Sequence, residues 1–461
     1  MNPLFLPLLT LSLLQGRAHQ RFALPRLSPE EGRAILSIQA KKLEGTLFFL
    51  ASDELEGRDT PSRGLRIAGR YIASRFLAAG LEGLGPKGSF FLENEVSTVR
   101  IPQAKVRFRT KGGKALRHLG LLQAPDQDLD LLAAPGKEIW LGDLPKAGSF
   151  PAMPGRKGRK VPPIFLAYRA ARRARAKGAK LCLLRVSPDS SLVARARGLA
   201  QPKALGRRGG FPIPVLLVPP GFAPEEDLDI HLPALVRDKS KVRNVAAILR
   251  GSDPEHAGEA LVFSAHMDHI GLKPGAEDPV FNGADDDASG CAGVIALAEA
   301  FASLETPPKR SLIFVTFWGE EKGLLGSRAF LKNSPWPKDK IIADINIEMI
   351  GRPEEGAEGK IWMTGWGHSN LGTYMAQGAR RARVRIFEHP KYSEMLYGAS
   401  DNRSFVQQGI VAHSFSAGSL HSDYHGTGDE YQKLDFPHME KVVRGLFAGA
   451  LPIAQAQLTP R

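Results

Sequence analysis

Cysteine is nearly absent from this chain, which has 2 among its 461 residues. Cys182 and Cys291 lie far apart in the sequence, and two isolated thiols of this kind are typical of small buried side chains, not of a disulfide framework. A zinc site of the cysteine type is therefore excluded. A metal site in this protein would have to use histidine and carboxylate ligands.

Long apolar runs are absent as well. No stretch approaches the roughly 18–20 apolar residues that a membrane-spanning helix needs, so we expect no transmembrane segment in the mature protein. The short apolar run from Leu4 to Leu14, followed by small residues up to Ala18, resembles a secretory leader without the usual positively charged start. We expect a signal peptide over residues 1–18 and a secreted or periplasmic protein.

Acidic residues are in the minority, and the formal net charge is +14. The excess is local, because residues 155–188 hold eleven Lys or Arg and no acid. A nucleic-acid binder usually adds aromatic side chains that stack on bases, and this segment has only Phe165 and Tyr168. We interpret the segment as a solvated helix face or a weak contact with an anionic envelope, and we expect no nucleic-acid partner.

The remaining composition, with 43% hydrophobic residues, is that of a globular protein long enough for two domains. Apolar residues at helical spacing predict helices at 29–50 and about 67–79, in the helical first part of the main domain, residues 19–95. Residues 96–225 change to short β-like runs between Gly- and Pro-rich turns, so we expect an inserted small β-rich domain there. Its predicted elements include a strand at 163–167 and a helix at 170–177.

Residues 240–461 repeat a pattern of strand, loop and helix. Continuous apolar runs at 260–265, 311–318 and 341–349 are typical of central strands that are buried on both faces. The pattern predicts an α/β fold with a mixed, largely parallel sheet sandwiched by helices. In such sheets ligands bind beyond the carboxyl ends of the strands.

Histidine and acidic residues gather where these predicted strands end. Each of them alone has an ordinary explanation as a surface histidine, a helix cap or a solvated acid. Packed together without a cation, several of these carboxyl groups would have to be protonated. The residues are His266 and Asp268 after the first strand, Glu320 and Glu321 after the second, Glu348 after the third, Asp285 to Asp287 before a helix, and His425 after the last strand.

Nitrogen and oxygen ligands of this kind suit Zn²⁺ and tolerate Mn²⁺ or Co²⁺. The ligands are too many for one tetrahedral ion, whereas two ions that share one carboxylate and one water would use them all. One of the adjacent residues Glu320 and Glu321 would then be left as a general base.

The runs around these residues resemble zinc metallopeptidase family twenty-eight. This family of two-zinc aminopeptidases also contains glutamate carboxypeptidase, glutaminyl cyclase and the non-catalytic transferrin receptor. The likeness extends over almost the full chain, and the segments Leu50 to Arg58 and Arg243 to Val245 resemble the secreted bacterial members. It implies that residues 96–225 form a protease-associated domain and that residues 240–461 form the main zinc peptidase domain.

The resemblance also implies a role for each site residue and two Zn²⁺ per chain. The implied ligands are His266 and Glu348 for one zinc ion, Glu321 and His425 for the other, and Asp285 as the shared carboxylate, with a cis bond to Asp286. The implied catalytic residues are Glu320 as general base, Asp268 as the acid that orients His266, and Tyr424 as a donor to the oxyanion. Family members usually have Asp at the position of Glu348, and Glu keeps the charge and the ligand atoms.

The function implied by this likeness is that of an aminopeptidase acting on peptides with a free N-terminus. Three alternatives stay open. A transferase of the glutaminyl cyclase type tends to lack the full triple-Asp loop, a receptor-like relative loses ligands or the base, and a carboxypeptidase for acidic C-termini needs an arginine cluster at the pocket. The sequence leaves open the preferred N-terminal residue, the native metal, the oligomeric state and the role of Ser400-Asp401.

Overall fold

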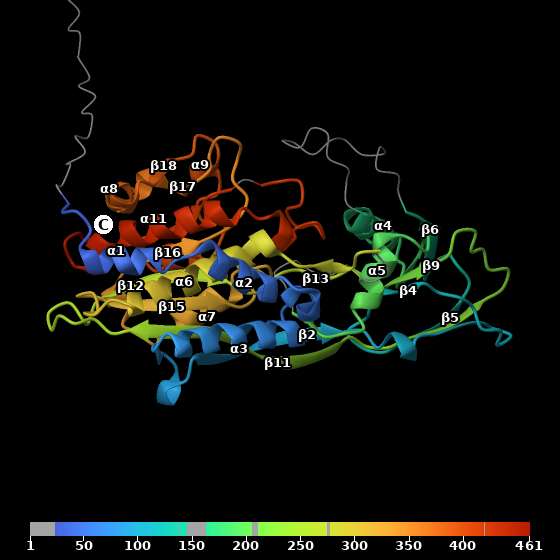
Figure 1. Ribbon diagram of the computed structural model, residues 1–461. Helices are drawn as coiled ribbons and strands as arrows, with labels where there is room; N and C mark the ends of the chain where they lie inside the picture. Colours follow the sequence, from blue (N-terminus) through green and yellow to red (C-terminus); the bar gives the residue numbers. More distant parts are fainter. Residues whose placement is uncertain (1–23, 137, 145–162, 205–210, 274–276, 419) are drawn as a thin grey trace, which may run out of the picture.

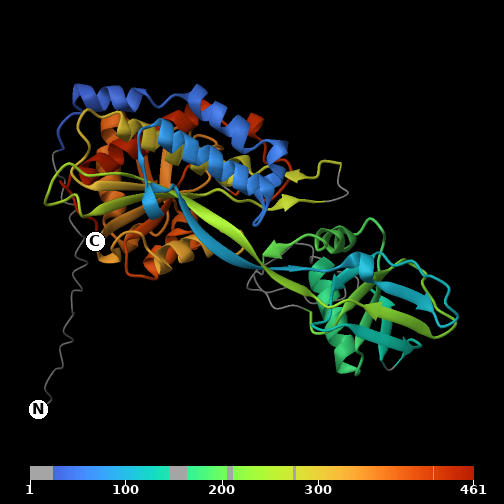
Figure 2. The same ribbon diagram turned by 90° about the horizontal axis from the view of Figure 1, so that it is seen from below.

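The computed structural model describes residues 24–136, 138–144, 163–204, 211–273, 277–418 and 420–461. The predicted leader, residues 1–18, lies outside the described residues. The described chain forms a larger α/β unit and a smaller β-rich unit, which two long strands connect (Figure 1, Figure 2). Among the described helices, none combines the length and apolarity that crossing a bilayer would need.

The larger unit is built on a ten-stranded sheet with the order β18-β17-β19-β16-β12-β15-β11-β2-β8, and β1 pairs with β11 off this path. Its centre is parallel, with β12 between β15 and β16 and with β19 beside β16. The predicted mixed sheet between helices is confirmed. The strands are β1 (Glu82–Gly83), β2 (Phe91–Arg100), β8 (Lys203–Ala204), β11 (Val236–Leu249), β12 (Ala260–His266), β15 (Ser311–Phe317), β16 (Ile341–Ile347), β17 (Lys360–Met363), β18 (Arg385–Glu388) and β19 (Ala412–Ser416).

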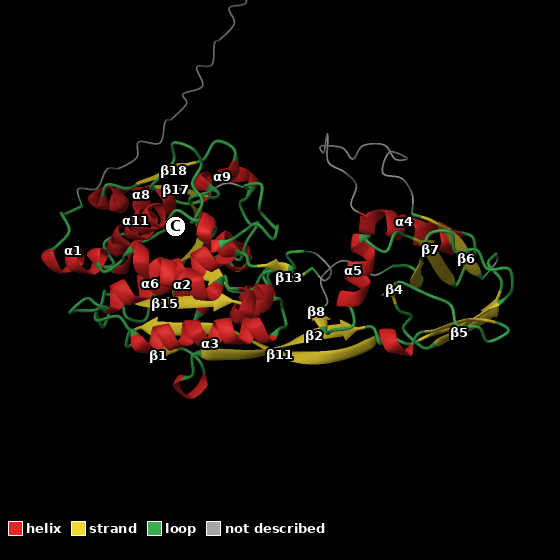
Figure 3. Cartoon of the chain, turned by 45° about the vertical axis from the view of Figure 1, so that its right-hand side comes forward, coloured by secondary structure: helices red, strands yellow, loops and turns green. Residues whose placement is uncertain are grey.

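The central strands bury both faces, which explains their continuous apolar runs. Along β12, Leu261 and Phe263 belong to a large core, while Ala260 and Val262 belong to a smaller core on the opposite face. The larger core is completed by α1, α2, α3, α6, α8 and α11, and the smaller one by α7 and α10. Figure 3 shows the helices of the larger core, among them α2, α3 and α6, beside the sheet.

The predicted helix at 29–50 is two helices in the structure. Ser28 caps α1 and Pro29 fits its first turn, but the chain leaves the helical conformation at Gln39 before α2 begins. The helices of this unit are α1 (Pro29–Leu36), α2 (Ala40–Leu50), α3 (Arg63–Ala78), α6 (Gly290–Ala302), α7 (Leu325–Lys332), α8 (Leu371–Ala379), α9 (Tyr392–Met395), α10 (Asn402–Val406) and α11 (Phe436–Ala454).

The smaller unit contains a four-stranded sheet, β4-β9-β7-β6, and a three-stranded sheet, β3-β10-β5. The prediction of a strand at 163–167 is wrong, because these residues begin α4. Leu166, Ala167, Ala170 and Ala174 are buried at helical spacing, and the proline at the first helical position favours the helix. The elements are β3 (Arg107–Thr110), β4 (Gly120–Gln123), β5 (Leu129–Ala133), β6 (Ile139–Asp143), α4 (Pro163–Ala176), β7 (Leu181–Arg185), α5 (Ser191–Gly198), β9 (Val215–Val218) and β10 (Leu228–Leu232).

The two connecting strands, β2 and β11, pair with each other over ten residues from Phe91 to Arg100. Because β2 belongs to the main sheet, the two units share one continuous ribbon of strands (Figure 2). The likeness of the smaller unit to a protease-associated domain stays a prediction.

Candidate metal centre

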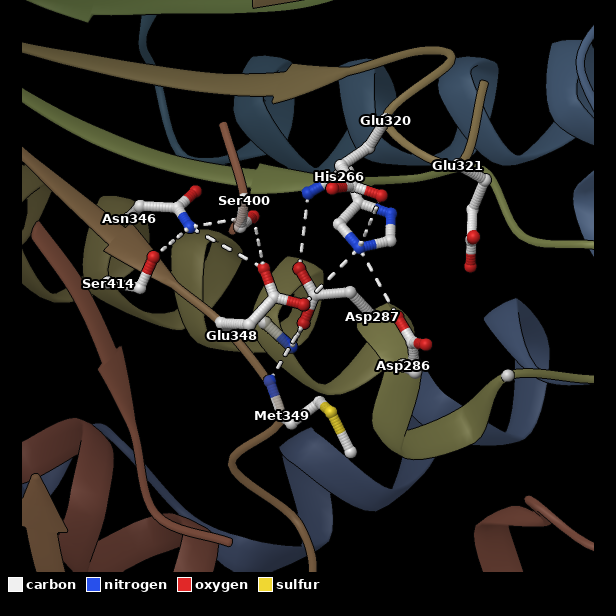
Figure 4. A network of polar contacts seen from close by, with 12 residues as sticks. His266, Asp286, Asp287, Glu320, Glu321, Asn346, Glu348, Met349, Ser400 and Ser414 are labelled. Atoms are coloured by element: carbon white, nitrogen blue, oxygen red, sulfur yellow. Dashed lines mark hydrogen bonds and ion pairs between the residues drawn. The ribbon is translucent and has the colours of Figure 1, made fainter. Parts of the chain in front are cut away.

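The candidate site lies at the carboxyl ends of the central parallel strands, where a sheet of this type binds ligands. His266 is the last residue of β12, Glu348 directly follows β16, and Glu320 and Glu321 follow β15. Asp286 comes from a kinked turn, Ala284–Ser289, that leads into α6. Figure 4 shows His266 with dashed contacts to the carboxylates around it.

The first group consists of His266, Asp286 and Glu348. The Nε2 atom of His266 lies 3.3 Å from Oδ1 of Asp286 and 3.4 Å from Oε1 of Glu348. The Nδ1 atom of the same ring is 3.1 Å from the backbone oxygen of Asp268 and 3.7 Å from its carboxylate. A proton on Nδ1 thus holds the ring in place and leaves the lone pair of Nε2 free for a metal ion.

The second group lies on the other side of Asp286. Oδ2 of this residue is 3.2 Å from Nε2 of His425, which is also 3.5 Å from Oε1 of Glu321. A further histidine, His269, places Nδ1 at 3.0 Å from the same oxygen of Glu321. Asp286 therefore presents one carboxylate oxygen to each group, as a ligand shared by two metal ions does.

These separations fit metal ligands better than hydrogen bonds. Ligand atoms around a tetrahedral zinc ion, with bonds of about 2.0–2.2 Å, lie about 3.3 Å apart. Oε1 of Glu321 and both ring nitrogens of His269 are buried without a hydrogen-bond partner among the described residues. Because leaving such groups unpaired costs free energy, a bound cation would account for their arrangement. The donor set present fits two divalent ions.

The pKa values of the two groups are also consistent with binding of divalent ions. Burial and the Asp286 charge raise the pKa of Glu321, but the imidazoles of His269 and His425 outweigh them and lower it to about 2. Burial lowers the pKa of His425, whereas Asp286 and Glu321 raise it to about 10. The Glu321 carboxylate is thus ionised at neutral pH, and a binding metal ion would displace the proton of the His425 imidazole.

Asp285 does not take the place predicted for it. Its Oδ1 accepts a hydrogen bond of 2.6 Å from the backbone N–H of Gly351, and its Oδ2 lies 3.3 Å from Nε2 of His421. The residue that joins both groups is Asp286, and the cis peptide bond joins Asp286 to Asp287, one residue later than predicted. In a run of three Asp, the kinked backbone decides which side chain faces the site, and the residue spacing does not.

The other acids of this turn support the shared carboxylate. Asp429 accepts hydrogen bonds from the backbone N–H groups of Asp285 and Asp286, at 3.0 and 3.1 Å. Asp287 accepts from the N–H groups of His266 and Met349, and so links the ends of β12 and β16 (Figure 4). The turn is held in position from both neighbouring segments.

Glu320 lies close to the first group but does not join it. Its carboxylate is 4.0 Å from Nε2 of His266, and its backbone N–H donates to Asp268 at 3.0 Å. Burial raises the pKa of Glu320, the His266 imidazole lowers it, and the carboxylates of Asp401, Glu348 and Glu321 raise it further, with a net rise well above its usual range. The carboxyl group of Glu320 therefore holds a proton more strongly than an ordinary glutamate, and cations bound beside it would lower its pKa again.

A cleft of about 450 Å³ opens over both groups. Its lining includes Glu320, Met349, Trp362 and Tyr424. The Tyr424 ring stacks on that of His425 with centroids 4.0 Å apart. Burial and the surrounding carboxylates raise the pKa of Tyr424, so its hydroxyl stays protonated and can donate a hydrogen bond.

Ser400, whose role the sequence left open, contacts the first group. Its hydroxyl donates to Oε2 of Glu348 at 2.5 Å, and Asn346 donates to the hydroxyl oxygen of Ser400 at 3.2 Å. These contacts hold one oxygen of Glu348 and leave the other facing His266 (Figure 4). The longer arm of Glu, in place of the usual Asp, is thereby fixed.

We expect the substitution Ser400→Ala to weaken binding of one metal ion. Loss of the donor to Glu348 removes the contact that orients this ligand, and such partners typically contribute about 10–100-fold to metal affinity. Titration with a zinc-buffered chelator would measure the effect, with Ser97→Ala on the exposed side of β2 as the control. Unchanged affinity in Ser400→Ala would show that Glu348 is held without Ser400.

Arg58, the last residue of the segment Leu50 to Arg58, holds the backbone of the loops beside the site. Its buried guanidinium donates to four backbone oxygens, those of Leu50, Met267, Asn282 and Gly283. It thereby ties the first helices to the loops that follow β12 and precede the kinked turn. This explains why a charged residue is buried in that segment.

Comparison with known proteins identifies the class of the larger unit. Residues 244–449 match the sequence model of peptidase family M28. The α/β unit that carries the two histidine and carboxylate groups therefore belongs to peptidase family M28, as the residue motifs indicated.

Several relatives at the sequence level are named aminopeptidases, and others are named zinc metalloproteases. The chain is 24% identical over 280 residues to aminopeptidase YwaD of Bacillus subtilis, which covers 59% of this chain and 57% of that protein. It is 32% identical over 152 residues to an aminopeptidase of Pseudomonas aeruginosa, covering 32% of this chain and 26% of that protein. The aligned part thus spans between about a quarter and three fifths of these relatives.

Solved structures share the fold over most of the chain. An aminopeptidase from Aneurinibacillus sp. strain AM-1 superimposes with a TM-score of 0.54 at 18% identity, covering 92% of this chain and 95% of that one. The zinc aminopeptidase BSAP from Bacillus subtilis gives a TM-score of 0.55 at 16% identity, covering 90% and 94%. At this identity the likeness concerns the fold.

Proposed function

We propose that this protein is a zinc-dependent aminopeptidase that removes N-terminal residues from peptides. The observation that carries the proposal is Asp286, whose two carboxylate oxygens face two separate groups of histidine and acidic side chains. His266 and Glu348 would hold one zinc ion, and Glu321 and His425 the other. The names of the relatives and the family support this activity.

Two zinc ions held there would polarise the carbonyl of the scissile bond and lower the pKa of a water molecule between them. Glu320 accepts the proton of the attacking water and later gives it to the leaving amine. Asp268 positions His266 through the Nδ1 side of its ring. Tyr424 donates to the oxygen that becomes negatively charged in the transition state.

The charge of the site favours a substrate with a free amino group. Asp286, Glu320, Glu321 and Glu348 are carboxylates at the floor of one cleft, although the whole chain is positively charged. Two bound zinc ions would offset the charge of their ligand carboxylates, and Glu320, which is outside the ligand set, is the acidic group left to attract a substrate ammonium group. The rival transferase needs one zinc ion, and the rival receptor needs no base, so neither accounts for the complete set.

The test is hydrolysis of a panel of aminoacyl-p-nitroanilides by the purified protein. We expect release of nitroaniline that a chelator abolishes and added zinc restores. The amino acid whose nitroanilide is hydrolysed fastest shows which N-terminal residue the cleft prefers. No release from any of these substrates by protein that has been shown to bind zinc would rule out the aminopeptidase function.

A second candidate function is a peptidase that recognises a carboxylate on its substrate. Arg328 and Arg403 line the same cleft as the acidic floor. The alternative of a carboxypeptidase for acidic C-termini requires arginine at the pocket, and this observation favours it. Peptides with a blocked N-terminus and a C-terminal Glu distinguish the two, because only a carboxypeptidase cleaves them.

We also propose that the protein is exported by the leader predicted at residues 1–18. N-terminal sequencing of the protein from the medium or the periplasm tests this, with a new N-terminus near residue 19 as the expected result. Recovery of the protein only from the cytosol with residues 1–18 attached would contradict it.

A further inference from the structure

A groove of about 560 Å³ lies on the larger unit between the end of α8 and the strand β18. Its lining includes the consecutive residues 384–388, which contain the whole of β18, and the aromatic side chain of Trp366. Three arginines, Arg380, Arg383 and Arg385, belong to the same lining. The groove shares no lining residue with the cleft over the metal groups, so it is a separate feature of the molecule.

The groove follows a free edge of the main sheet. β18 is the outermost strand, and among the described strands β17 is the one that pairs with it (Figure 1). The other edge of such a strand presents backbone N–H and C=O groups that have no strand partner. Ile386 is buried, whereas the guanidinium of Arg385 lies over the ring of Phe387, 5.4 Å from its centroid. An extended peptide can add to a free edge of this kind.

Positive charge prevails in the groove. Arg380, Arg383 and Arg385 are exposed, and their guanidinium groups form no ion pair within the part of the chain that the structure describes. Glu388 is the acidic residue of the lining. Arg381, in the same run, is half-buried and instead donates to backbone oxygens of α8 and α11. The three exposed arginines repel one another, and a bound group with several carboxylates would neutralise them.

The backbone at Arg383 supplies a second, independent observation. Arg383 follows the 3-10 turn Arg380–Ala382 that ends α8, and its φ of +59° lies in the left-handed region. The N–H of Val384 donates to the oxygen of Ala379 at 3.1 Å, and helices that end in this way usually have glycine at the left-handed position. A bulky side chain is strained there. The helix end therefore does not account for the arginine, whereas a contact made by its side chain does.

We propose that this groove binds an acidic peptide segment in an extended conformation, which pairs with the free edge of β18 and places its carboxylates on Arg380, Arg383 and Arg385. Main-chain hydrogen bonds to the strand supply affinity, and the arginines select acidic side chains. A second copy of the chain does not fit, because pairing of two β18 edges would bring the arginines of both copies together. The site is independent of the metal centre and of the proposed aminopeptidase activity.

The test measures binding of a fluorescent hexapeptide of alternating Glu and Thr, blocked at both ends so that an exopeptidase cannot degrade it. Fluorescence anisotropy with the purified wild-type protein should show saturable binding that weakens as the salt concentration rises. The same peptide with Lys in place of Glu should not bind. Two versions are N-methylated on alternate backbone nitrogens, and at least one of them should bind more than about tenfold more weakly, because it loses hydrogen bonds to the strand.

The substitution Arg383→Gly tests the site without endangering the fold. Glycine suits the left-handed backbone, so Tm should not fall, while the affinity for the acidic peptide should fall by up to about 5-fold, as for the loss of one surface ion pair. The double variant Arg380→Ser/Arg383→Gly should lose more than about tenfold. The control Arg172→Ser/Arg175→Ser removes the same charge from exposed positions of α4 in the smaller unit and should keep the affinity within about twofold.

Three results would overturn the proposal. The first is no saturable binding of the acidic peptide by the wild type. The second is unchanged affinity in the double variant, or an equal loss in the α4 control, since binding would then follow the total charge of the protein. The third is equal binding of the N-methylated and unmodified peptides together with displacement by inorganic phosphate, which would make the groove a site for small anions. None of these measurements depends on hydrolysis, so the aminopeptidase function is judged separately.

Discussion

Replacing Glu320 by Gln should lower kcat by about 10²–10⁴-fold while both metal ions remain bound. Gln keeps the shape of the side chain and its backbone N–H contact to Asp268, but it cannot accept the proton of the attacking water. The ion pair that the described residues give between Glu320 and the first group is the one with His266 at 4.0 Å, so loss of its charge should leave the metal ligands in place. Steady-state kinetics with the best aminoacyl-p-nitroanilide and zinc analysis on the same preparation measure both quantities.

The control for this prediction is Glu255→Gln, which changes an exposed glutamate in the turn before β12. It should leave kcat and zinc content unchanged. If Glu320→Gln keeps activity within a few-fold of the wild type, another group acts as the base. Loss of zinc along with activity would instead assign Glu320 to the metal ligands.

Asp286→Asn should remove metal ions from both groups and abolish measurable hydrolysis. Each oxygen of Asp286 faces a different group, so the single change removes charge from both sites at once. We expect the affinity for zinc to fall by more than the roughly 10–100-fold that orienting partners contribute. Zinc per chain after dialysis, together with hydrolysis of the same substrate, gives the result.

Asp285→Asn is the matched control, because it makes the same chemical change one residue earlier in the same turn. The amide oxygen can still accept the hydrogen bond from Gly351. We expect two zinc ions per chain and activity within about 100-fold of the wild type, as for a group outside the ligand set. The reverse pattern, with zinc lost in Asp285→Asn and kept in Asp286→Asn, would restore the assignment that the sequence predicted.

The sequence predicts those features of the fold that depend on residue type and on the order of the strands. Buried apolar runs located β12, β15 and β16, and the rule that ligands bind beyond strand ends collected His266, Glu320, Glu321 and Glu348 at one edge. The prediction failed where chain geometry decides. A run such as residues 163–167 is apolar enough for a strand, and only its packing with the following alanines made it a helix.

The turn with three aspartates is a second case in which backbone geometry decides what the sequence cannot predict. Asp285, Asp286 and Asp287 are chemically identical, and their roles differ because the backbone of the turn is not helical at the second and third of them. Asp286 faces the two metal groups, while its neighbours accept hydrogen bonds from Gly351, His266 and Met349. No feature of composition or spacing separates them.

The sequence shows His269 and Ser400 beside recognisable motifs, but it does not predict which side chains they contact. His269 stands in the same short motif as His266, and Ser400 lies beside an acid that resembles a family motif. Only the fold brings Ser400 to Glu348 across 52 positions and His269 to Glu321 across 52 positions. Both contacts are long-range, and long-range contacts are fixed by how strands and helices pack.

The sequence by itself determined the α/β class, and it predicted the edge of the sheet where the candidate site lies and the kind of candidate metal ligand, because periodicity and residue type encode burial and donor atoms. The tertiary structure decided which of three adjacent aspartates is shared, which histidines meet at one point and which serine holds Glu348. These choices depend on side-chain direction, and direction is set by backbone torsions and packing between segments that are distant in the chain.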